Sequence, residues 1–165
     1  MGVLLLLLTV FNSPQADTDN LAAIKTGFIY NFFRFIQWPD TGTSYRLCSA
    51  ATSDLESVLL TLENKLVNQK PIHVSIRVES NALKNCDLIF IDSKTALQPI
   101  LAAIHDLPIL TVGDHTDFIE QGGMIELTEF DNRLAYELNL DTAKASGLQI
   151  SAQMLKLAKT VINTP

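Results

Sequence analysis

The chain has 165 residues, of which 47% are hydrophobic and 18% are charged, and its 12 basic and 18 acidic residues give a net charge of −6. This length supports one domain with a sizeable core, and the apolar content excludes an intrinsically disordered chain. The acidic balance, without a cluster of Lys and Arg, argues against a nucleic-acid-binding protein, because phosphates demand a basic surface.

The amino-terminal segment carries no charged side chain over residues 1–16. Its apolar run, residues 2–11, is too short to span a bilayer, which needs about 20 residues, but has the length of the apolar part of a signal peptide. Ala16 offers a small residue for cleavage. We therefore expect residues 1–16 to be a signal peptide and residues 17–165 to be a single exported domain. A buried first strand or helix is the alternative.

The domain is predicted to start with a long helix. Residues 17–20 are rich in N-cap types and precede a periodic apolar segment, which predicts a helix over residues 21–38. Pro39 disfavours helical geometry at the residue before it and so ends this helix. Residues 44–50 follow as a strand.

The next segments alternate between helix and strand. Ser53 and Glu56 have the spacing of a capping box, which opens a helix to about residue 66. Residues 71–78 alternate between apolar and polar side chains, as in a half-buried strand, and the apolar run of residues 86–91 is typical of a central buried strand.

In the second half of the domain, the sequence predicts a helix over residues 95–105, with Pro99 near its start, and a strand over residues 108–112. A polar connection over residues 113–123, with a helical turn around Phe118, leads to a hairpin of strands 124–128 and 133–138. A short helix over residues 142–146, followed by Gly147, and a last helix from Ser151 to residue 162 complete the domain. The whole order predicts an α/β fold. We expect a three-layer sandwich with a central mixed, mostly parallel sheet of five or six strands flanked by helices, and an antiparallel edge made by the hairpin.

Two cysteines are present, Cys48 in the first predicted strand and Cys86 at the start of a later one. An even number of cysteines in an exported protein suggests a disulfide, and neighbouring strand ends can bring two cysteines within bridging range. Two buried free thiols are the alternative. The missing Cys-x-x-Cys spacing disfavours a redox enzyme.

Catalytic, metal-binding and cofactor-binding motifs are not recognisable in the sequence. The three histidines have no metal-ligand spacing, and neither a nucleophile elbow nor a phosphate-binding glycine loop occurs. Residues 114–117 (DHTD) place two carboxylates beside an imidazole, which suits a weak metal or acid–base site, but a solvated turn is the simpler interpretation. We therefore predict a protein that is not an enzyme and has no cofactor and no metal.

Half of the aromatic residues lie within residues 28–38. On a helix, Tyr30 and Trp38 fall outside the main core-facing stripe and Phe33 belongs to a neighbouring stripe. Aromatic residues left on a surface are typical interface anchors. A wide helix face buried between the sheet and a neighbouring helix is the alternative.

The order and spacing of several blocks resemble the YfiR family of small periplasmic proteins over almost all of residues 21–162. The blocks are residues 25–39 (KTGFIYNFFRFIQWP), Cys48, residues 86–91 (CDLIFI), residues 110–114 (LTVGD) with Phe118, residues 122–125 (GGMI), residues 136–140 (YELNL) and residues 147–151 (GLQIS) leading to Leu155.

This resemblance implies a mixed α/β fold, export to the periplasm, a Cys48–Cys86 disulfide and a homodimer. It implies a regulatory protein that binds the periplasmic part of an inner-membrane sensor, a diguanylate cyclase, and represses it. Release of the cyclase would raise cyclic di-GMP and favour biofilm formation. The alternative is a small-ligand sensor that feeds another membrane sensor, such as a histidine kinase, and binds its ligand at the carboxyl ends of the strands.

The candidates for partner or ligand binding are Tyr30, Phe33, Arg34 and Trp38 in the aromatic block and, carried over from the family's C-terminal block, Glu137, Asn139, Ser151 and Leu155. The resemblance places the second group around a surface patch implicated in partner control. As a strand residue, Glu137 faces solvent or, if it is buried, needs a partner or a raised pKa.

Overall fold

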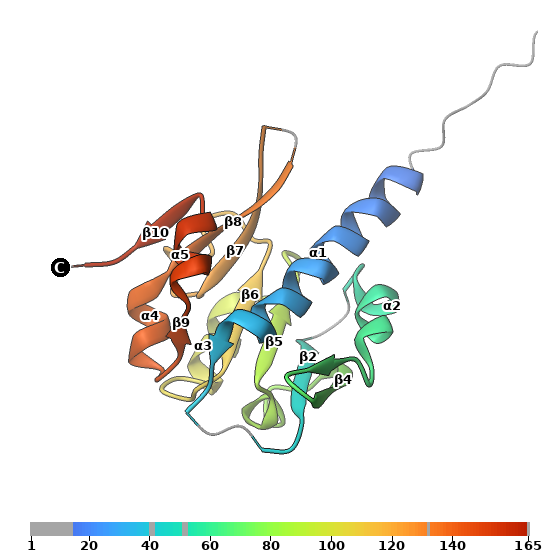
Figure 1. The fold of residues 1–165 in the computed structure, drawn as a ribbon. Coiled ribbons are helices and arrows are strands. Elements are labelled where there is room, and N and C mark those ends of the chain that lie inside the picture. The colour runs from blue at the N-terminus through green and yellow to red at the C-terminus, as the bar shows by residue number, and fades with distance from the viewer. Residues whose placement is uncertain (1–14, 40–41, 51–52, 132, 165) are drawn as a thin grey trace, which may run out of the picture.

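The computed structural model describes residues 15–39, 42–50, 53–131 and 133–164 (Figure 1). The expected signal peptide falls mostly on residues 1–14, which lie outside this part. None of the helices in the described ranges is long and apolar enough to cross a membrane.

The helices are α1 Gln15–Phe35, α2 Glu56–Leu59, α3 Leu97–Ala103, α4 Leu140–Ala145 and α5 Ala152–Leu157, with short 3-10 helices η1 Leu60–Leu62 and η2 Leu83–Asn85. The strands are β1 Ile36–Gln37, β2 Tyr45–Ala50, β3 Leu66–Val67, β4 Lys70–Val78, β5 Leu88–Ile91, β6 Leu110–Gly113, β7 Ile125–Phe130, β8 Arg133–Asn139, β9 Gln149–Ile150 and β10 Thr160–Ile162. Most predicted elements are therefore present near their expected positions.

The central sheet has the strand order β10-β8-β7-β6-β5-β2-β4-β3. Neighbouring strands run parallel, except β7 with β8 and β3 with β4. The predicted mixed, mostly parallel sheet is confirmed, but it has eight strands rather than five or six. The additional strands β3 and β10 are too short to show alternation in the sequence. The hairpin is not the edge of the sheet, because β10 pairs with β8 beyond it.

Helices cover both faces of this sheet. Alternation along β2 and β5 directs Leu47 and Phe90 into a core shared with α1, which crosses that face in Figure 1. The intervening residues Cys48 and Ile89 enter a second core, which includes Ile100 of α3. Two cores on opposite faces of one sheet make the three layers that the sequence predicts.

Several helices end earlier than predicted. α1 ends before Trp38 because β1 leaves the helix to pair antiparallel with β9 in a separate two-stranded sheet. The helix expected to reach residue 66 is reduced to α2 and η1, and the chain turns into β3 through Asn64, whose φ is 62°. The last helix ends at Leu157 because β10 follows it. Around Phe118 the chain forms a single turn, in which the Gln121 N–H donates to the Asp117 carbonyl four residues earlier at 3.1 Å, and the turn does not continue into a helix.

Candidate functional site

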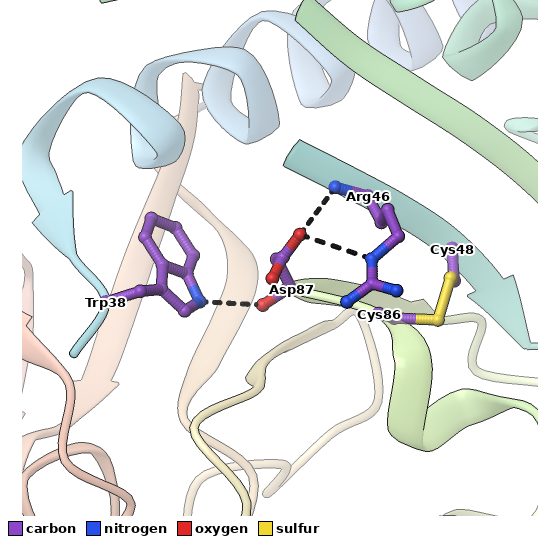
Figure 2. Close-up of a disulfide and its surroundings, with 5 residues drawn as sticks. All are labelled: Trp38, Arg46, Cys48, Cys86 and Asp87. Carbon is purple, nitrogen blue, oxygen red and sulfur yellow. Dashed lines mark hydrogen bonds and ion pairs between the residues drawn. A yellow bond between two sulfur atoms is a disulfide. The ribbon is translucent and has the colours of Figure 1, made fainter. Parts of the chain in front are cut away.

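The predicted disulfide joins Cys48 of β2 to Cys86, with Cα atoms 6.0 Å apart. Beside it, the Asp87 carboxylate accepts the Arg46 backbone N–H at 2.7 Å, and the Asp87 carbonyl accepts the Trp38 indole N–H at 3.0 Å (Figure 2). Burial raises the pKa of the Asp87 carboxyl, and the hydrogen bond from Arg46 opposes this shift. The disulfide and these hydrogen bonds together anchor the end of the aromatic segment to β2 and β5.

Two of the aromatic-block candidates are core residues. Phe33 is fully buried, and its ring stacks on Trp38 with centroids 5.6 Å apart and lies 5.1 Å from the Tyr45 ring. Trp38 itself is only 7% exposed. A wide buried helix face, one of the two interpretations of the sequence, accounts for both side chains, so they present almost no surface to a partner.

The other two candidates of this block lie at the surface of α1. The Tyr30 hydroxyl donates to the Leu66 carbonyl of β3 at 2.9 Å, which ties α1 to the edge of the sheet. Arg34 is exposed, and its guanidinium lies over the Phe35 ring, 5.6 Å from the centroid. Arg34 is therefore the member of the aromatic block whose charge is most open to a partner.

Two C-terminal candidates cap helices. The Asn139 side chain accepts the Thr142 N–H at 2.9 Å as the N-cap of α4 and donates to the Ile119 carbonyl at 2.9 Å. Ser151 accepts the Met154 N–H at 3.3 Å, which confirms the predicted cap of α5. Both residues thus position helices, because capping satisfies backbone donors that a helix start leaves unpaired.

Glu137 and Leu155 complete the C-terminal group. Glu137 is half-buried in β8 and pairs with the Lys159 ammonium at 2.5 Å. The sequence leaves open whether Glu137 faces solvent or is buried with a partner, and the structure shows it half-buried with Lys159 as its partner. Leu155 is partly buried and packs against the first core.

A groove of about 240 Å³ separates α1 from α5 and is called here the α1–α5 groove. Its apolar lining comes from Phe28, Phe32, Phe35, Tyr136, Met154 and Leu157, and its polar lining from Asn31, Arg34 and Gln153. Phe28, Phe32 and Tyr136 contact one another edge to face. Sequence reasoning placed the aromatic stripe of α1 but missed the opposite wall, because the fold rather than any local pattern brings α5 beside α1.

The Tyr136 hydroxyl, which lines this groove, has a raised pKa that can be measured. The hydroxyl donates to the Met154 carbonyl at 2.6 Å, and burial raises its pKa from 10.0 to about 12. The neutral Tyr136 hydroxyl therefore contributes fully to the free energy of unfolding below pH 10, and this contribution is lost as the pH rises through about 12. Ultraviolet titration of the folded chain should show a tyrosine with this pKa, and the Tyr136→Phe variant should lack it. A Tyr136→Phe chain that keeps this titration step would contradict the assignment.

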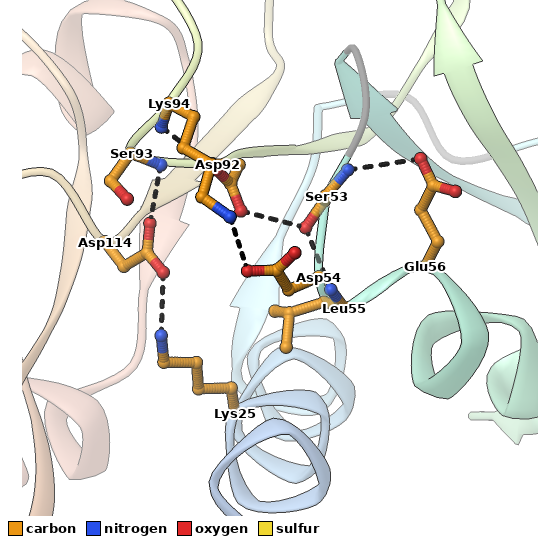
Figure 3. A network of polar contacts seen from close by, with 9 residues as sticks. All are labelled: Lys25, Ser53, Asp54, Leu55, Glu56, Asp92, Ser93, Lys94 and Asp114. Atoms are coloured by element: carbon orange, nitrogen blue, oxygen red, sulfur yellow. Dashed lines mark hydrogen bonds and ion pairs between the residues drawn. The ribbon is translucent and has the colours of Figure 1, made fainter. Parts of the chain in front are cut away.

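A cluster of hydrogen-bonded polar side chains lies at the carboxyl ends of β2, β5 and β6 (Figure 3). Asp92, only 4% exposed, accepts the Ser53 hydroxyl at 3.2 Å and the Lys94 backbone N–H at 2.9 Å. Asp114 pairs with Lys25 of α1 at 2.7 Å. These two carboxylates are thus held by partners within the fold, and no group of three metal-ligating side chains was found among the described residues.

A pocket of about 400 Å³ lies beside this cluster, at the carboxyl ends of the neighbouring strands β2 and β4 and against the start of α3. Its lining includes Ala50, Arg77, Val78, Thr95 and Ile100. The Arg77 guanidinium is bound by both carboxylate oxygens of Glu56, with a closest contact of 2.8 Å. Open α/β sheets bind their ligands outside the carboxyl ends of the strands, which is where this pocket lies.

Comparison with known proteins adds two findings. A family model described as YfiR/HmsC-like matches residues 22–159. Among solved structures, the crystal structure of a conserved domain protein from Vibrio cholerae O1 biovar El Tor str. N16961 superposes with a TM-score of 0.54 and 11% sequence identity over 86% of this chain. The match spans 60% of that protein's chain, and at this identity it shows a shared fold alone.

Proposed function

Because the chain belongs to the YfiR/HmsC-like family, we propose that it is a non-enzymatic periplasmic protein that binds and represses an inner-membrane signalling protein, a diguanylate cyclase. Binding lowers cyclic di-GMP, and release raises it. The family match over residues 22–159 carries this proposal. The Cys48–Cys86 disulfide supports the compartment, because disulfides persist in the oxidising periplasm and are rare in the cytosol.

The α1–α5 groove is the surface proposed to contact the cyclase. It combines an aromatic floor, an exposed leucine and an arginine, which are residue types that carry binding energy at interfaces. Leu157 at its rim is 65% exposed, and Arg34 supplies the charge. Ser151 acts behind this surface, because its cap positions the helix that forms one wall.

Leu157→Asp should abolish repression while leaving the fold intact. A carboxylate at this rim would have to be desolvated against aromatic rings, which should weaken partner binding about tenfold or more. The measurement is cellular cyclic di-GMP in a strain that lacks the gene and is complemented with each variant. Wild type should lower cyclic di-GMP, and Leu157→Asp should leave it high.

Leu66→Asp is the matched control for this variant. Leu66 is similarly exposed, at 61%, but lies in β3 at the opposite edge of the sheet from β10. It should repress like wild type. If deletion and overexpression of the gene both leave cyclic di-GMP unchanged, a cyclase partner is excluded. If Leu157→Asp represses like wild type, only the α1–α5 groove is excluded as the contact surface.

The homodimer implied by the resemblance is also proposed, and sedimentation of the purified chain measures it.

A small-ligand sensor is the second candidate function, and the pocket of about 400 Å³ at the carboxyl ends of β2 and β4 favours it. Its volume lies within the range of small-molecule sites. A ligand bound there would raise the melting temperature by linkage. Melting curves with amino acids, nucleotides and cell-wall fragments therefore distinguish a sensor from a protein that binds only its membrane partner.

A further inference from the structure

β7 and β8 project beyond the rest of the sheet as a two-stranded arm (Figure 1). β6 ends at Gly113, level with Glu126, so residues 127–130 of β7 have no strand beside them on that side in the described part of the chain. On the far side, β10 pairs only with residues 137–139 of β8. A two-stranded ribbon is marginally stable by itself, so a third strand would stabilise this arm.

The backbone groups at the open edge follow from the pairing of β7 with β8. The Asn139 N–H donates to the Met124 carbonyl at 2.8 Å, so these residues form a hydrogen-bonded pair. Such pairs alternate along an antiparallel ladder, and the even-numbered residues of β7 therefore direct their N–H and C=O groups to β8. The carbonyl of Leu127 and both backbone groups of Glu129 point to the open side.

This open edge forms a wall of a pocket of about 240 Å³. The other walls come from Leu21 and Lys25 of α1, residues 114–116 after β6, and Leu134 of β8. Three acidic residues line the pocket, and two of their carboxylates are already bound: that of Asp114 pairs with the Lys25 ammonium, and that of Glu126 accepts the Phe118 backbone N–H at 2.8 Å. Glu129 lies two residues after Leu127 on the same face of β7, and no ion pair of its side chain occurs among the described residues. Its carboxylate therefore leaves a negative charge beside the open backbone groups.

We propose that this edge accepts an extended, basic peptide segment of another protein as an added β-strand. In strand addition, main-chain hydrogen bonds supply affinity and side-chain contacts supply specificity. The negative charge of the edge distinguishes between a second copy of this chain and a basic peptide as the added strand. A second copy of this chain pairing through the same edge would bring its own Glu129 close to this one, and like charges facing each other destabilise a sheet. A lysine or arginine of an added strand meets the Glu129 carboxylate favourably.

The test uses the full chain and blocked, fluorescent peptides of alternating Val and Lys. Fluorescence anisotropy should show binding at least about tenfold tighter than that of the matched Val–Glu peptide. Methylating the peptide backbone nitrogens along one edge should abolish binding, because the added strand then loses its donors. Hydrogen exchange at the Glu129 N–H should slow when the Val–Lys peptide is bound.

Two variants distinguish the contribution of the Glu129 backbone N–H to peptide binding from that of its side-chain charge. Glu129→Pro removes an N–H that faces the open edge, and proline is tolerated at sheet edges, so the pairing with β8 should survive while peptide binding is lost. Glu129→Gln keeps the N–H and should reduce only the preference for the basic peptide. Should Glu129→Pro fail to fold, the backbone-methylated peptide tests the same hydrogen bonds.

Three results would overturn the inference. They are equal binding of the basic and acidic peptides, binding that survives backbone methylation, and a dimer that Glu129→Pro converts to monomer, which would make a second copy the occupant. The inference is independent of the proposed function, because the peptides contact the arm and Leu157→Asp tests the α1–α5 groove. Either can therefore fail alone.

Discussion

Removing the Cys48–Cys86 disulfide should lower the free energy of unfolding by about 4 kcal/mol. The two cysteines are 38 residues apart in the sequence, and in the chain-entropy model a cross-link closing a loop of this length restricts the unfolded chain by about that amount. For a domain of this size the melting temperature should fall by roughly 8–16 °C. Urea and thermal unfolding of the Cys48→Ala/Cys86→Ala variant beside wild type measure the effect.

Reductant provides the control for this variant. Wild type with both thiols free should unfold like the double variant, and the double variant should not respond to reductant. Trp38 is the only tryptophan, and its indole bonds to the residue after Cys86, so its fluorescence reports on the same region. Reduced and oxidised wild type that unfold at the same urea concentration would show that the cross-link contributes no stability.

Phe33→Ala should cost about 3–5 kcal/mol of folding free energy. The ring is fully buried and contacts both Trp38 and Tyr45, so truncation removes aromatic contacts and leaves a cavity that the surrounding sheet and helix cannot fully close. Chemical unfolding monitored by circular dichroism measures the loss.

Phe130→Ala is the matched control for Phe33→Ala. Phe130 is 53% exposed at the end of β7, and its contact with the Lys159 ammonium is a surface one, so its loss should cost less than about 1 kcal/mol. Combining Phe33→Ala with Trp38→Ala should cost less than the sum of the single losses, because the rings share one contact. Equal costs for Phe33→Ala and Phe130→Ala would contradict the assignment of Phe33 to the core.

Local patterns predicted the elements whose residues alternate or cluster strongly. The alternation of β4 and the apolar run of β5 are both present, because burial of one or both sheet faces imposes these patterns. Ser151 caps α5, and Gly147 adopts a φ of 80° after α4, as a residue ending a helix commonly does. These features depend on residues close in sequence, which is why sequence alone indicates them.

Features that depend on distant pairing were missed. β1 and β9 are two residues long and exist because they pair with each other, and β10 exists because it pairs with β8. The same limit applies to the candidate site. Phe33 and Tyr30 are both aromatic residues of α1, and only the positions of Tyr45 and Leu66 decide which one is core and which one is tied to a sheet edge.

The small β1–β9 sheet also bears on the order in which this chain can fold. It joins the end of α1 to the segment just before α5, and the Ser151 N–H donates to the Phe35 carbonyl beside it. Contacts between segments so distant in sequence require a large loop to close before they gain any stability. Because a polypeptide is synthesised from its amino end, α1 exists long before this pairing strand. The last residues to arrive therefore complete the packing of the first helix.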